Sequence, residues 1–557
     1  MNLIILSMKL LEGLRRSFES ATKDPLKAQR AILLQYLQRN KNTEYGRKHN
    51  FAAIRSIEEY RNAVPLNSYE TLRPYVDKMT KGEANILTRD KVVFFGATSG
   101  TTNKPKLIPT THYSERKKEE LMNLWSYYIS RDHPDVLDGK ILAIVSPEVE
   151  GTTDSGIPFG AESGYSYRML PKPIMNLYAL PYEVFEIEDY EARHYAILRI
   201  SIEQNITTIA TLNPNMIVLL CRKIERWQNM IISDIEHGSL SDSLKITPAI
   251  RKAMKNRLKP NPDRARELKE IIENHGRLLP RHFWPEMKLI ECWQGGMMKL
   301  YLQELDNYFG CVPKRDIGCV STEARASIPI TDETSSGVLA IQTNFYEFIP
   351  KDGPDNAARN TLVCTQLEIN KEYFIVVTTA GGLYRYNIDD IIKVTGFFNK
   401  TPLIEFVQKG LGASSLAGEK LYEAHINETM TRVLQKEKVL IDFFCAVAQP
   451  SDGPRYSFLI EFSGSTPTRE RAGSVLASIE EELRIQNREY DFVRNAQLLD
   501  SPVLKLLKKG SFENYRLKRI AEGAQEGQFK APQLTNNPDF EKNFDIEMVI
   551  QLSDPPA

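Results

Sequence analysis

The first 90 or so residues carry apolar positions at the spacing of α-helices. Near the N-terminus these positions recur every three or four residues, at Leu10, Leu11, Leu14 and Phe18. Basic residues lie among them rather than ahead of them, which is typical of an amphipathic packing helix and not of a signal peptide. Because proline interrupts the hydrogen bonds of a helix, we expect breaks at three pairs, Asp24-Pro25, Val64-Pro65 and Arg73-Pro74.

A short apolar run, Val92 to Phe95, predicts a strand that leads into a polar loop. The loop, residues 96–103, is built from glycine, alanine, serine, threonine and asparagine, and lysines come after it. Small residues let backbone N–H groups approach an anion, hydroxyls add donors, and lysines add positive charge, so the loop suits a polyphosphate. It is not a Walker A loop, because Thr101 follows Gly100 where that motif has a Lys-Ser/Thr pair. The alternative is a polar surface loop between two strands.

Between this loop and residue 316, helical and strand-like patterns alternate. Apolar periodicity predicts helices at 114–128, 189–204, 216–235 and 262–275. Short apolar runs predict strands at 140–145 and 288–293. Residues 150–166, rich in glycine, serine and threonine, predict a mobile loop without helices or strands.

Beyond residue 316 the pattern changes to β-structure. Apolar and alternating runs predict strands at 337–345, 373–379, 383–386, 391–394 and 403–407. Residues 408–415 have the composition of a linker. After this linker, the pattern predicts a helix, two strands and a second helix, at 418–437, 440–448, 455–462 and 468–486.

The length of the chain, 557 residues, exceeds what one hydrophobic core usually supports. We therefore expect two domains, residues 1–408 and residues 409–557, divided at the linker. The expected fold class is α/β, with mixed helices and strands. The large N-terminal domain has β-sheets flanked by helices, and the small C-terminal domain is α+β.

Composition and charge exclude some classes of partner. Apolar residues make up 42% of the chain, and Lys plus Arg equals Asp plus Glu at 72 each, so no basic excess indicates a nucleic-acid partner. The six cysteines are scattered without a C-x-x-C pair, as expected of reduced thiols in a cytoplasmic protein. The eight histidines show no spacing typical of a zinc site. We expect no membrane span, and a monomer.

Three stretches of the sequence, taken in order, resemble the motifs of one enzyme family. The first is Thr98-Ser99-Gly100-Thr101-Thr102-Asn103-Lys104-Pro105-Lys106. Together with two stretches later in the chain, it resembles the auxin-responsive acyl acid–amido synthetases, a branch of the acyl-adenylate-forming enzymes, whose phosphate loop is of SSGTS type. The resemblance covers nearly the whole chain, and we expect a non-plant-like member of that family. It implies that ATP phosphates are held by Thr98, Ser99, Gly100 and Thr101, with Lys106 as a supporting cation.

The second stretch is Gly318-Cys319-Val320-Ser321-Thr322-Glu323, which resembles the family's Y-x-S-S-E. The resemblance implies that Glu323 binds a Mg²⁺ ion bridging to phosphate and that Thr322 contacts the nucleotide. One glutamate suffices, because Mg²⁺ keeps most of its waters and takes phosphate oxygens. Gly318 or Cys319 stands near the family's tyrosine, whose ring stacks on adenine. The alternative is that residues 321–323 simply begin a strand.

The third stretch is Tyr384-Arg385-Tyr386-Asn387-Ile388-Asp389-Asp390, which looks like the family's Y-R-x-G-D. In that element the aspartate binds both ribose hydroxyls, and a carboxylate accepts the two hydrogen bonds of a vicinal diol. Asp390 is the matching aspartate. Asp389 stands where glycine is usual, so the turn must differ or tolerate another residue, and a shared role for Asp389 stays open. The alternative is a pair of aspartates at the end of a hairpin.

Two lysines complete the resemblance. Residues 406–421 resemble the family's crossover into a C-terminal lid, in which Lys420 would approach the nucleotide phosphates. Gly527-Gln528-Phe529-Lys530-Ala531-Pro532 resembles the family's Q-x-K-x-P segment, whose lysine enters the site when the lid closes. An ammonium group there would stabilise the negative charge that builds on the α-phosphate and the attacking carboxylate. Taken alone, each lysine is more typical of a solvated surface residue.

The resemblance implies an ATP- and Mg²⁺-dependent ligase. Its small-molecule substrates would be a carboxylic acid, activated as an acyl-adenylate, and an amino acid whose amine takes the acyl group. The N-terminal domain would bind ATP and the acid, and the C-terminal domain would be a mobile lid that excludes water and reorients near residue 408. Two alternatives stay open, acyl transfer to the thiol of coenzyme A and a catalytically retired nucleotide-binding protein.

The acid pocket is the least determined part of the site. We expect it beside the helix after the phosphate loop and along residues 150–180, where four side chains cluster, Tyr165, Tyr167, Met169 and Tyr178. The alternative is that these are core or loop-anchoring side chains. Arg168 or Arg131 could pair with the acid carboxylate, and nothing in their spacing selects one.

Overall fold

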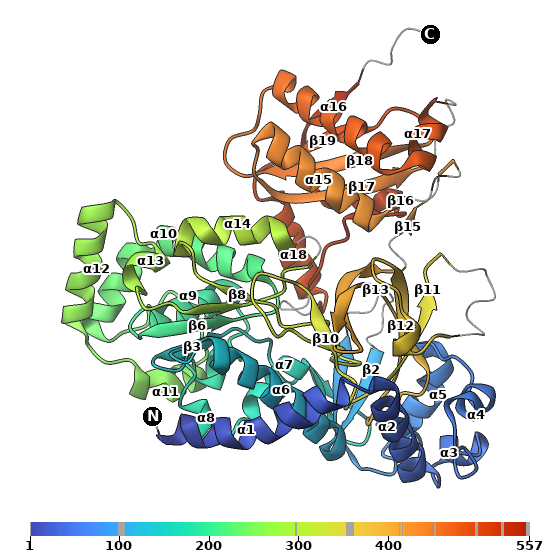
Figure 1. Ribbon diagram of the computed structural model, residues 1–557. Helices are drawn as coiled ribbons and strands as arrows, with labels where there is room; N and C mark the ends of the chain where they lie inside the picture. The colour runs from blue at the N-terminus through green and yellow to red at the C-terminus, as the bar shows by residue number, and fades with distance from the viewer. Residues whose placement is uncertain are drawn as a thin grey trace. The chain divides into compact units, whose positions relative to one another are not determined.

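The computed structural model describes residues 2–98, 106–295, 298–352, 361–410, 413–414, 416–417, 419, 421–450, 453–495, 499–524 and 529–552. Helices and several β-sheets occur together along the chain, which confirms the expected mixed α/β fold (Figure 1). The chain forms two compact units, Met1–Phe406 and Val407–Ala557. The boundary expected at residue 408 falls inside strand β14 (Thr401–Lys409).

The first unit begins with five helices, α1 (Asn2–Ala21), α2 (Pro25–Asn40), α3 (Glu44–Lys48), α4 (Ile57–Ala63) and α5 (Tyr69–Thr80). The breaks expected at Pro25 and Pro65 are found, because α2 begins at Pro25 and α4 ends at Ala63. The break expected at Arg73-Pro74 is wrong, since α5 continues through Pro74. One face of α5 is buried, through Tyr69, Leu72, Val76 and Met79. This packing outweighs the hydrogen bond that the proline removes.

A small four-stranded sheet holds the ends of the polar loop. Its order is β2-β1-β5-β4, with β1 (Val92–Thr98), β2 (Lys106–Thr111), β4 (Gly151–Thr152) and β5 (Pro158–Gly160). Strand β5 pairs in parallel with β1, and helix α7 (Glu162–Arg168) comes after it, so the prediction of no elements in 150–166 is wrong. The glycines there permit close packing rather than mobility. A Cβ on Gly160 would lie 2.1 Å from the carbonyl oxygen of Glu148.

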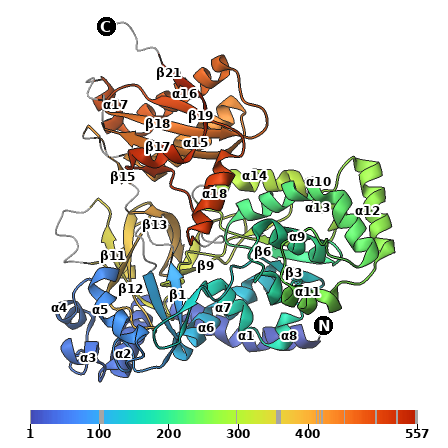
Figure 2. The same cartoon turned by 180° about the vertical axis from the view of Figure 1, so that it is seen from behind.

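A parallel sheet forms the second layer of this unit, in the order β3-β6-β7-β8. Its strands are β3 (Lys140–Ala143), β6 (Ile206–Ala210), β7 (Leu289–Glu291) and β8 (Lys314–Arg315). Between β2 and β8 the chain also forms the helices α6 (His112–Asp132), α8 (Lys172–Met175), α9 (Tyr190–Ser201), α10 (Pro214–His237), α11 (Pro248–Met254), α12 (Pro262–His275), α13 (Pro280–Phe283) and α14 (Met298–Phe309). Helix α12 ends where Gly276 takes a φ of 76°, as the sequence pattern predicted. Helices α10, α12 and α13 lie at the end of the unit away from β11 and β12 in both views (Figures 1 and 2).

The third layer of this unit is a six-stranded sheet in the order β11-β12-β13-β14-β10-β9. Besides β14, its strands are β9 (Ser327–Ile328), β10 (Gly337–Leu339), β11 (Phe345–Pro350), β12 (Glu372–Thr378) and β13 (Tyr386–Phe398). The two strands expected near 383–386 and 391–394 correspond to one strand, β13, with an irregular register against β12. Side chains of this sheet and of helices α2 to α5 share one core, which includes Tyr36, Leu72, Phe348 and Ile392.

The second unit has the helix, strand, strand and helix order that the pattern predicted. Its five-stranded sheet has the order β20-β17-β18-β19-β21. The strands are β17 (Ile441–Gln449), β18 (Arg455–Phe462), β19 (Val503–Leu507), β20 (Leu534–Thr535) and β21 (Ile546–Gln551). The helices are α15 (Glu423–Glu437), α16 (Arg469–Gln486), α17 (Arg488–Asn495) and α18 (Ser511–Ala521), and a short pair, β15 (Ala413–Ser414) and β16 (Leu421–Tyr422), precedes them.

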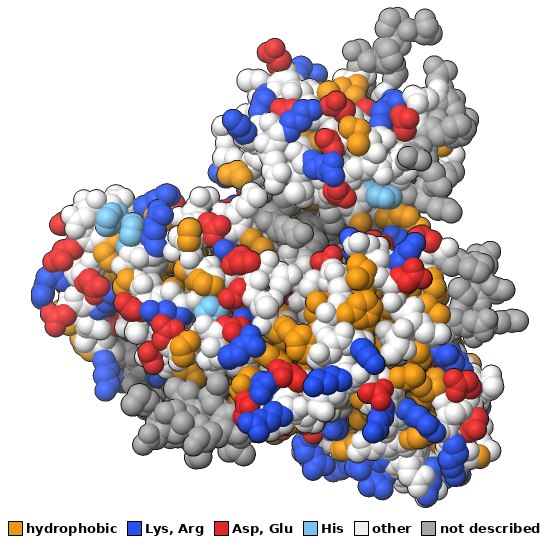
Figure 3. Space-filling view, viewed as in Figure 1, with side chains coloured by type: hydrophobic (Ala, Val, Ile, Leu, Met, Phe, Trp, Pro, Cys, Tyr) orange, Lys and Arg blue, Asp and Glu red, His pale blue; other side chains and the backbone are white. Residues whose placement is uncertain are grey.

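The surface shows no segregation of charge on the face drawn in Figure 3. Acidic and basic side chains are interspersed over each unit there. Within the described ranges, no helix is long and apolar enough to cross a membrane. None of the six cysteines forms a disulfide, and four of them are buried.

Candidate functional site

The polar loop is held at both ends by an antiparallel pair of strands. Strand β1 leads into it and β2 leads out, and Thr98 is paired with Lys106 across the two strands. Ser99, Gly100 and Thr101 lie outside the described residues, and so does the side chain of Thr98. The described strands therefore fix where the loop begins and ends.

Lys106, the first residue of β2, lies beside an aromatic ring. Its Nζ is 6.0 Å from the ring centroid of Tyr69, at the start of α5. The hydroxyl of Tyr69 accepts a hydrogen bond of 2.8 Å from the backbone N–H of Leu107. Tyr69 thus fixes the strand through its oxygen and faces the ammonium group with its ring, which places one positive charge at the exit of the loop.

A tight turn brings the second motif against β1. Val320 and Arg325 form an isolated bridge, and the Ser321 N–H donates to the carbonyl of Ala324 at 2.9 Å, so that Thr322 and Glu323 lie at the tip. A Cβ added to Gly96 would lie 2.4 Å from Cγ2 of Thr322. Only glycine in β1 allows the threonine methyl group to pack this closely.

Glu323 connects this turn to the third motif. The Tyr386 hydroxyl, at the start of β13, donates a hydrogen bond to the Glu323 carboxylate. Burial raises the pKa of Tyr386, and the neighbouring Glu323, Tyr69 and Asp390 add to the effect. Tyr386 therefore stays a hydrogen-bond donor, and both Glu323 and Asp390 lie near enough for their charges to act on it.

Asp389 takes the backbone conformation that a glycine would take. Its φ is 64°, in the left-handed region. Opposite it, Phe374 pairs with Ile391 and Val376 pairs with Asn387, so β13 has extra residues here and forms a bulge. The Asn387 side chain accepts a hydrogen bond of 3.0 Å from the Asp389 N–H. This turn tolerates aspartate, one of the non-glycine residues that adopt positive φ most readily.

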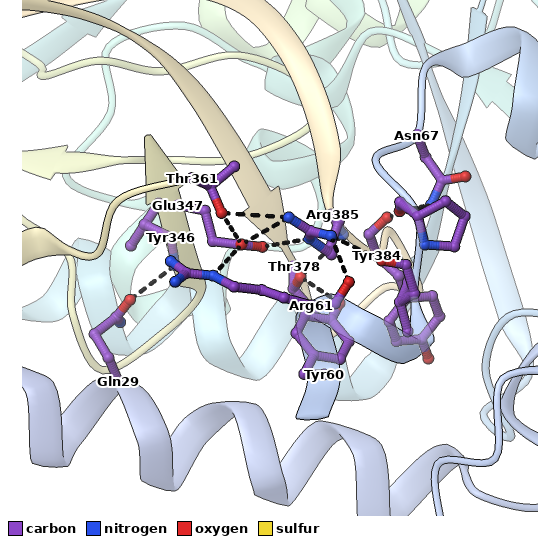
Figure 4. A network of polar contacts seen from close by, with 12 residues as sticks. Gln29, Tyr60, Arg61, Asn67, Tyr346, Glu347, Thr361, Thr378, Tyr384 and Arg385 are labelled. Carbon is purple, nitrogen blue, oxygen red and sulfur yellow. Dashed lines mark hydrogen bonds and ion pairs between the residues drawn. The ribbon is translucent and has the colours of Figure 1, made fainter. Parts of the chain in front are cut away.

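A buried ion-pair network holds the strand just before Asp390 (Figure 4). Arg385 is 3% exposed and takes a φ of 43°. It donates to both carboxylate oxygens of Glu347 at 3.0 and 3.1 Å, to the carbonyls of Arg61 and Val64, and to Thr361 Oγ1. Every N–H of the guanidinium is thereby engaged, which stabilises the strained backbone that leads into the bulge.

No aromatic side chain stands at position 319, but one lies beside the turn. Cys319 is half-buried, and burial raises the pKa of its thiol to about 12. Trp293 is also half-buried, and its Nε1 donates a hydrogen bond of 3.1 Å to the carbonyl of Gly318. Asp316 holds both segments together, because its carboxylate accepts from the N–H groups of Gln294 and Gly318 at 2.6 Å each. Nothing along the chain had singled out Trp293.

The two lysines of the expected lid belong to the second unit. Lys420 lies outside the described residues. Lys530 is exposed, and its charge acts on the carboxyl group of Glu423, which also accepts a hydrogen bond of 2.7 Å from the Gln533 N–H. The roles expected for Lys420 and Lys530 therefore stay predictions.

The arginines expected to meet the acid already have carboxylate partners. Arg168 pairs with Glu148 at 2.9 Å, and Arg131 pairs with Asp132 at 2.7 Å. The four-residue cluster expected to line the pocket is divided. Tyr165 stacks on Phe94 of β1 at 4.4 Å and Tyr167 packs against Tyr178 in the core beside the parallel sheet, whereas Met169 is 59% exposed.

Sequence reasoning missed a different arginine. Arg325, two residues after Glu323, lies with its Cζ 5.0 Å from the ring centroid of Trp125 in α6, and its Nη1 contacts Sδ of Met122. One turn earlier in α6, Lys118 forms ion pairs with Glu162 of α7 and with Glu115. The only signal in the sequence was the position of Arg325 directly after the Glu323 motif, and its side-chain environment depends on α6.

The carboxylates at the site do not form a metal-binding cluster by themselves. In the parts of the chain that the structure describes, no group of three or more His, Cys, Asp or Glu side chains could hold a metal ion. A cation at Glu323 would therefore take most of its ligands from a bound molecule and from water, as Mg²⁺ does when it binds nucleotide phosphates.

Comparisons with known proteins agree along the whole chain. Models of the GH3 family match it in order, the N-terminal domain over residues 14–314, the central domain over 337–409 and the C-terminal domain over 422–539. A jasmonoyl–L-amino acid synthetase of Oryza sativa subsp. japonica is 27% identical, with 93% of this chain and 94% of that protein covered. A probable indole-3-acetic acid-amido synthetase of Arabidopsis thaliana is 26% identical, with 94% and 91% covered.

A solved structure of an acyl acid amido synthetase has the same fold. It superposes with a TM-score of 0.85 at 22% sequence identity and covers 99% of this chain and 98% of its own. The N-terminal family model alone spans more than half of the 557 residues. The protein that holds these polar-loop strands, the Glu323 turn and the Asp390 strand belongs to the GH3 family.

Proposed function

We propose that this protein is an ATP-dependent ligase that adenylates a carboxylic acid and transfers the acyl group to the amine of an amino acid. The observation that carries the proposal is the meeting of three separate stretches. Thr322 packs on the strand that enters the phosphate loop, and Glu323 is hydrogen-bonded to Tyr386 beside Asp390. The named activities of the relatives, synthetases that join an acid to an amino acid, support it.

The nucleotide would be bound by side chains from all three stretches. Residues 98–101 would wrap the phosphates with Lys106 beside them, Thr322 would contact the nucleotide, and Asp390 would accept hydrogen bonds from the ribose hydroxyls. With no aromatic side chain at position 319, adenine would stack on Trp293, whose ring lies next to Gly318.

Glu323 would be the protein ligand of a Mg²⁺ ion that neutralises phosphate charge. The residues fit that ion, because a single well-placed carboxylate is what Mg²⁺ takes from a protein when the bound nucleotide supplies phosphate oxygens. The Tyr386 hydroxyl fixes the rotamer of Glu323. The role of Tyr386 is therefore to orient the carboxylate.

Two displacements make up the reaction. An oxygen of the acid carboxylate attacks the α-phosphate of ATP, the bond to the β-phosphate oxygen breaks, and pyrophosphate leaves. The nitrogen of the amino acid then attacks the acyl carbon of the acyl-adenylate, AMP leaves, and the nitrogen loses a proton. Both steps bring anions together, so binding, positioning and positive charge supply the catalysis.

The second unit would act as a lid. Lys530 and Lys420 would bring ammonium groups to the α-phosphate and the acid carboxylate, each in one orientation of residues 409–557. Closure would protect the acyl-adenylate from water. A cytoplasmic monomer belongs to the same proposal, and six cysteines without a disulfide support that compartment.

The test is acid-dependent exchange of pyrophosphate into ATP, followed by product masses with amino acids or coenzyme A as acceptor. We expect exchange with at least one acid from a panel of aromatic, branched, fatty and dicarboxylic acids, and an amide product. Exchange with a thioester product would replace the amine by a thiol acceptor. ATP binding without exchange across the panel would contradict the ligase and indicate a retired nucleotide-binding protein.

A further inference from the structure

Arg325 is a half-buried cation whose N–H donors have few partners. Its Nη2 donates to the carbonyl of Ile317 at 2.7 Å, and Nη1 lies against the thioether of Met122. Its Nε is buried and has no hydrogen-bond partner. Among the described residues, no carboxylate lies within 4.0 Å of the guanidinium. A buried N–H of a charged group without an acceptor is costly unless something else supplies one.

The carboxylates nearest to Arg325 are engaged elsewhere. Glu162 is paired with Lys118, and Asp316 accepts two backbone N–H groups. Burial lowers the pKa of Arg325 to about 10, opposed by the charges of Asp316, Glu291 and Glu162 from beyond ion-pair distance. The guanidinium therefore keeps its charge at neutral pH.

Arg325 and Glu323 point to different elements although two positions separate them. The Glu323 carboxylate meets Tyr386 in β13, and the Arg325 guanidinium lies over Trp125 in α6. A group bound by Arg325 is thus not the group that reacts beside Glu323.

We propose that the acid substrate is a dicarboxylic acid and that Arg325 binds the carboxylate that does not react. This deepens the proposed function and rests on it. A guanidinium presents Nε–H and Nη2–H in parallel, which matches a carboxylate in a bidentate pair. In Arg325 the Nε–H has no partner, and Nη2 carries a second N–H besides the one that it donates to Ile317. Trp125 and Met122 supply apolar walls for the carbon skeleton between the two carboxylates.

The experiment compares each dicarboxylic acid with its own monoamide, which has almost the same shape and one charge less. Isophthalate and adipate, each beside its monoamide, are tested in pyrophosphate exchange with the full-length protein. We expect kcat/KM to favour the dicarboxylate in at least one pair by about 10- to 100-fold, the range for a charge-assisted hydrogen bond. Arg325→Gln should remove that preference, and Arg325→Lys should keep part of it.

The matched control is Arg131→Gln. Arg131, like Arg325, lies over an aromatic ring, here that of Tyr128 at 4.9 Å, but it pairs with Asp132 and is half-exposed. We expect it to leave the preference unchanged, and the thermal unfolding midpoint of each variant reports whether it folds. If Arg325→Gln does not fold, the ratio measured with Arg325→Lys decides.

Three outcomes would overturn the inference while the proposed function stands. These are exchange with monocarboxylic acids alone, a preference that survives Arg325→Gln, and equal losses for the dicarboxylate and its monoamide, which would place Arg325 on the reacting carboxylate. Exchange with no acid of either kind would instead contradict the proposed function itself.

Discussion

Arg385 is buried and Arg325 is half-buried, and the two arginines differ in how far their N–H groups are paired. Arg385 donates all of its N–H groups to a carboxylate, two carbonyls and a hydroxyl. Arg325 donates to one carbonyl and leaves Nε without a partner. The guanidinium of Arg385 finds all of its acceptors within the protein. The guanidinium of Arg325 does not, because the protein supplies no acceptor for its Nε.

We interpret this difference as one of role: Arg385 holds the fold, and Arg325 is free to bind a ligand. A fully paired buried ion holds the chain in one conformation, and here it holds the strained backbone at Arg385 that leads to Tyr386 and Asp390. An incompletely paired ion gains most from binding a ligand, because it lost its water on folding and the ligand supplies the missing acceptors. That difference of role can be tested by substitution, from the largest expected effect to the smallest.

Removing each arginine should have unequal consequences for stability. We expect Arg385→Met to lower the free energy of unfolding by about 3 kcal/mol, because the buried Glu347 would lose one of its two arginine partners and keep only Arg61. Arg325→Met should change it by less than about 1 kcal/mol, because no ion pair is lost. Urea unfolding followed by tryptophan fluorescence reports on the first unit, which holds all four tryptophans. Equal destabilisation by the two variants would contradict the view that Arg385 stabilises the fold and Arg325 does not.

Substitution of Glu323, which contacts the strand that follows Arg385 and precedes Arg325 by two residues, should lower activity without lowering stability. Glu323→Gln is expected to reduce acid-dependent pyrophosphate exchange about 100-fold, the loss typical of removing one positioned electrostatic group. Glu372→Gln is the control, since it removes a carboxylate from the same sheet at its ion pair with Lys351. Exchange at the wild-type rate in Glu323→Gln would show that this carboxylate does not bind the metal.

The charge of Arg325 should be visible in the pH dependence of stability through Glu291. Burial raises the pKa of Glu291 to about 8 from 4.5, and the charges of Arg315 and Arg325 oppose the rise. The stability that the protonated carboxyl contributes is complete below about pH 4.5 and is lost as the pH rises towards 8.

Glu291→Gln cannot ionise, so its stability relative to the wild type should increase between about pH 5 and pH 8, on the order of 2 kcal/mol. In the Arg325→Met background the same increase should extend to higher pH, because one of the opposing charges is gone. Unfolding measured across this pH range checks both statements. A difference that is constant with pH would contradict them.

The smallest effect is expected at the bulge. Asp389→Gly should raise the free energy of unfolding by up to about 1 kcal/mol, because glycine adopts a φ of 64° without the cost that a side chain imposes. It should also keep the KM for ATP, whereas Asp390→Asn should raise it about tenfold through weaker ribose binding. A raised KM in Asp389→Gly alone would assign the ribose to Asp389.

The sequence determined most of the elements and singled out the three stretches of the candidate site. Helix α12 and its Gly276 end follow from an apolar period of three to four residues and a residue free to adopt positive φ. The stretches around Thr98, Glu323 and Asp390 could be recognised because each is continuous along the chain. Their local order is set by neighbouring residues, which is the level at which sequence patterns act.

The failures have a common cause. Helix α5 continues through Pro74, and residues 150–166 form two strands and part of a helix. In both places, packing against elements distant in sequence outweighed the local preference for a break or a loop. Asp389 is a related case, since a residue unusual for its turn is tolerated where the strand before it is held by Arg385.

Only the tertiary structure decided which arginine faces the acid. Arg131 and Arg168 were as good candidates as any along the chain, and both proved to have carboxylate partners. Arg325 differs because α6 supplies a ring and a thioether beside it, and no acceptor for its Nε. Charge along the chain is determined by the sequence, but whether a charge is satisfied depends on neighbours from other elements, and that is settled only when the chain folds.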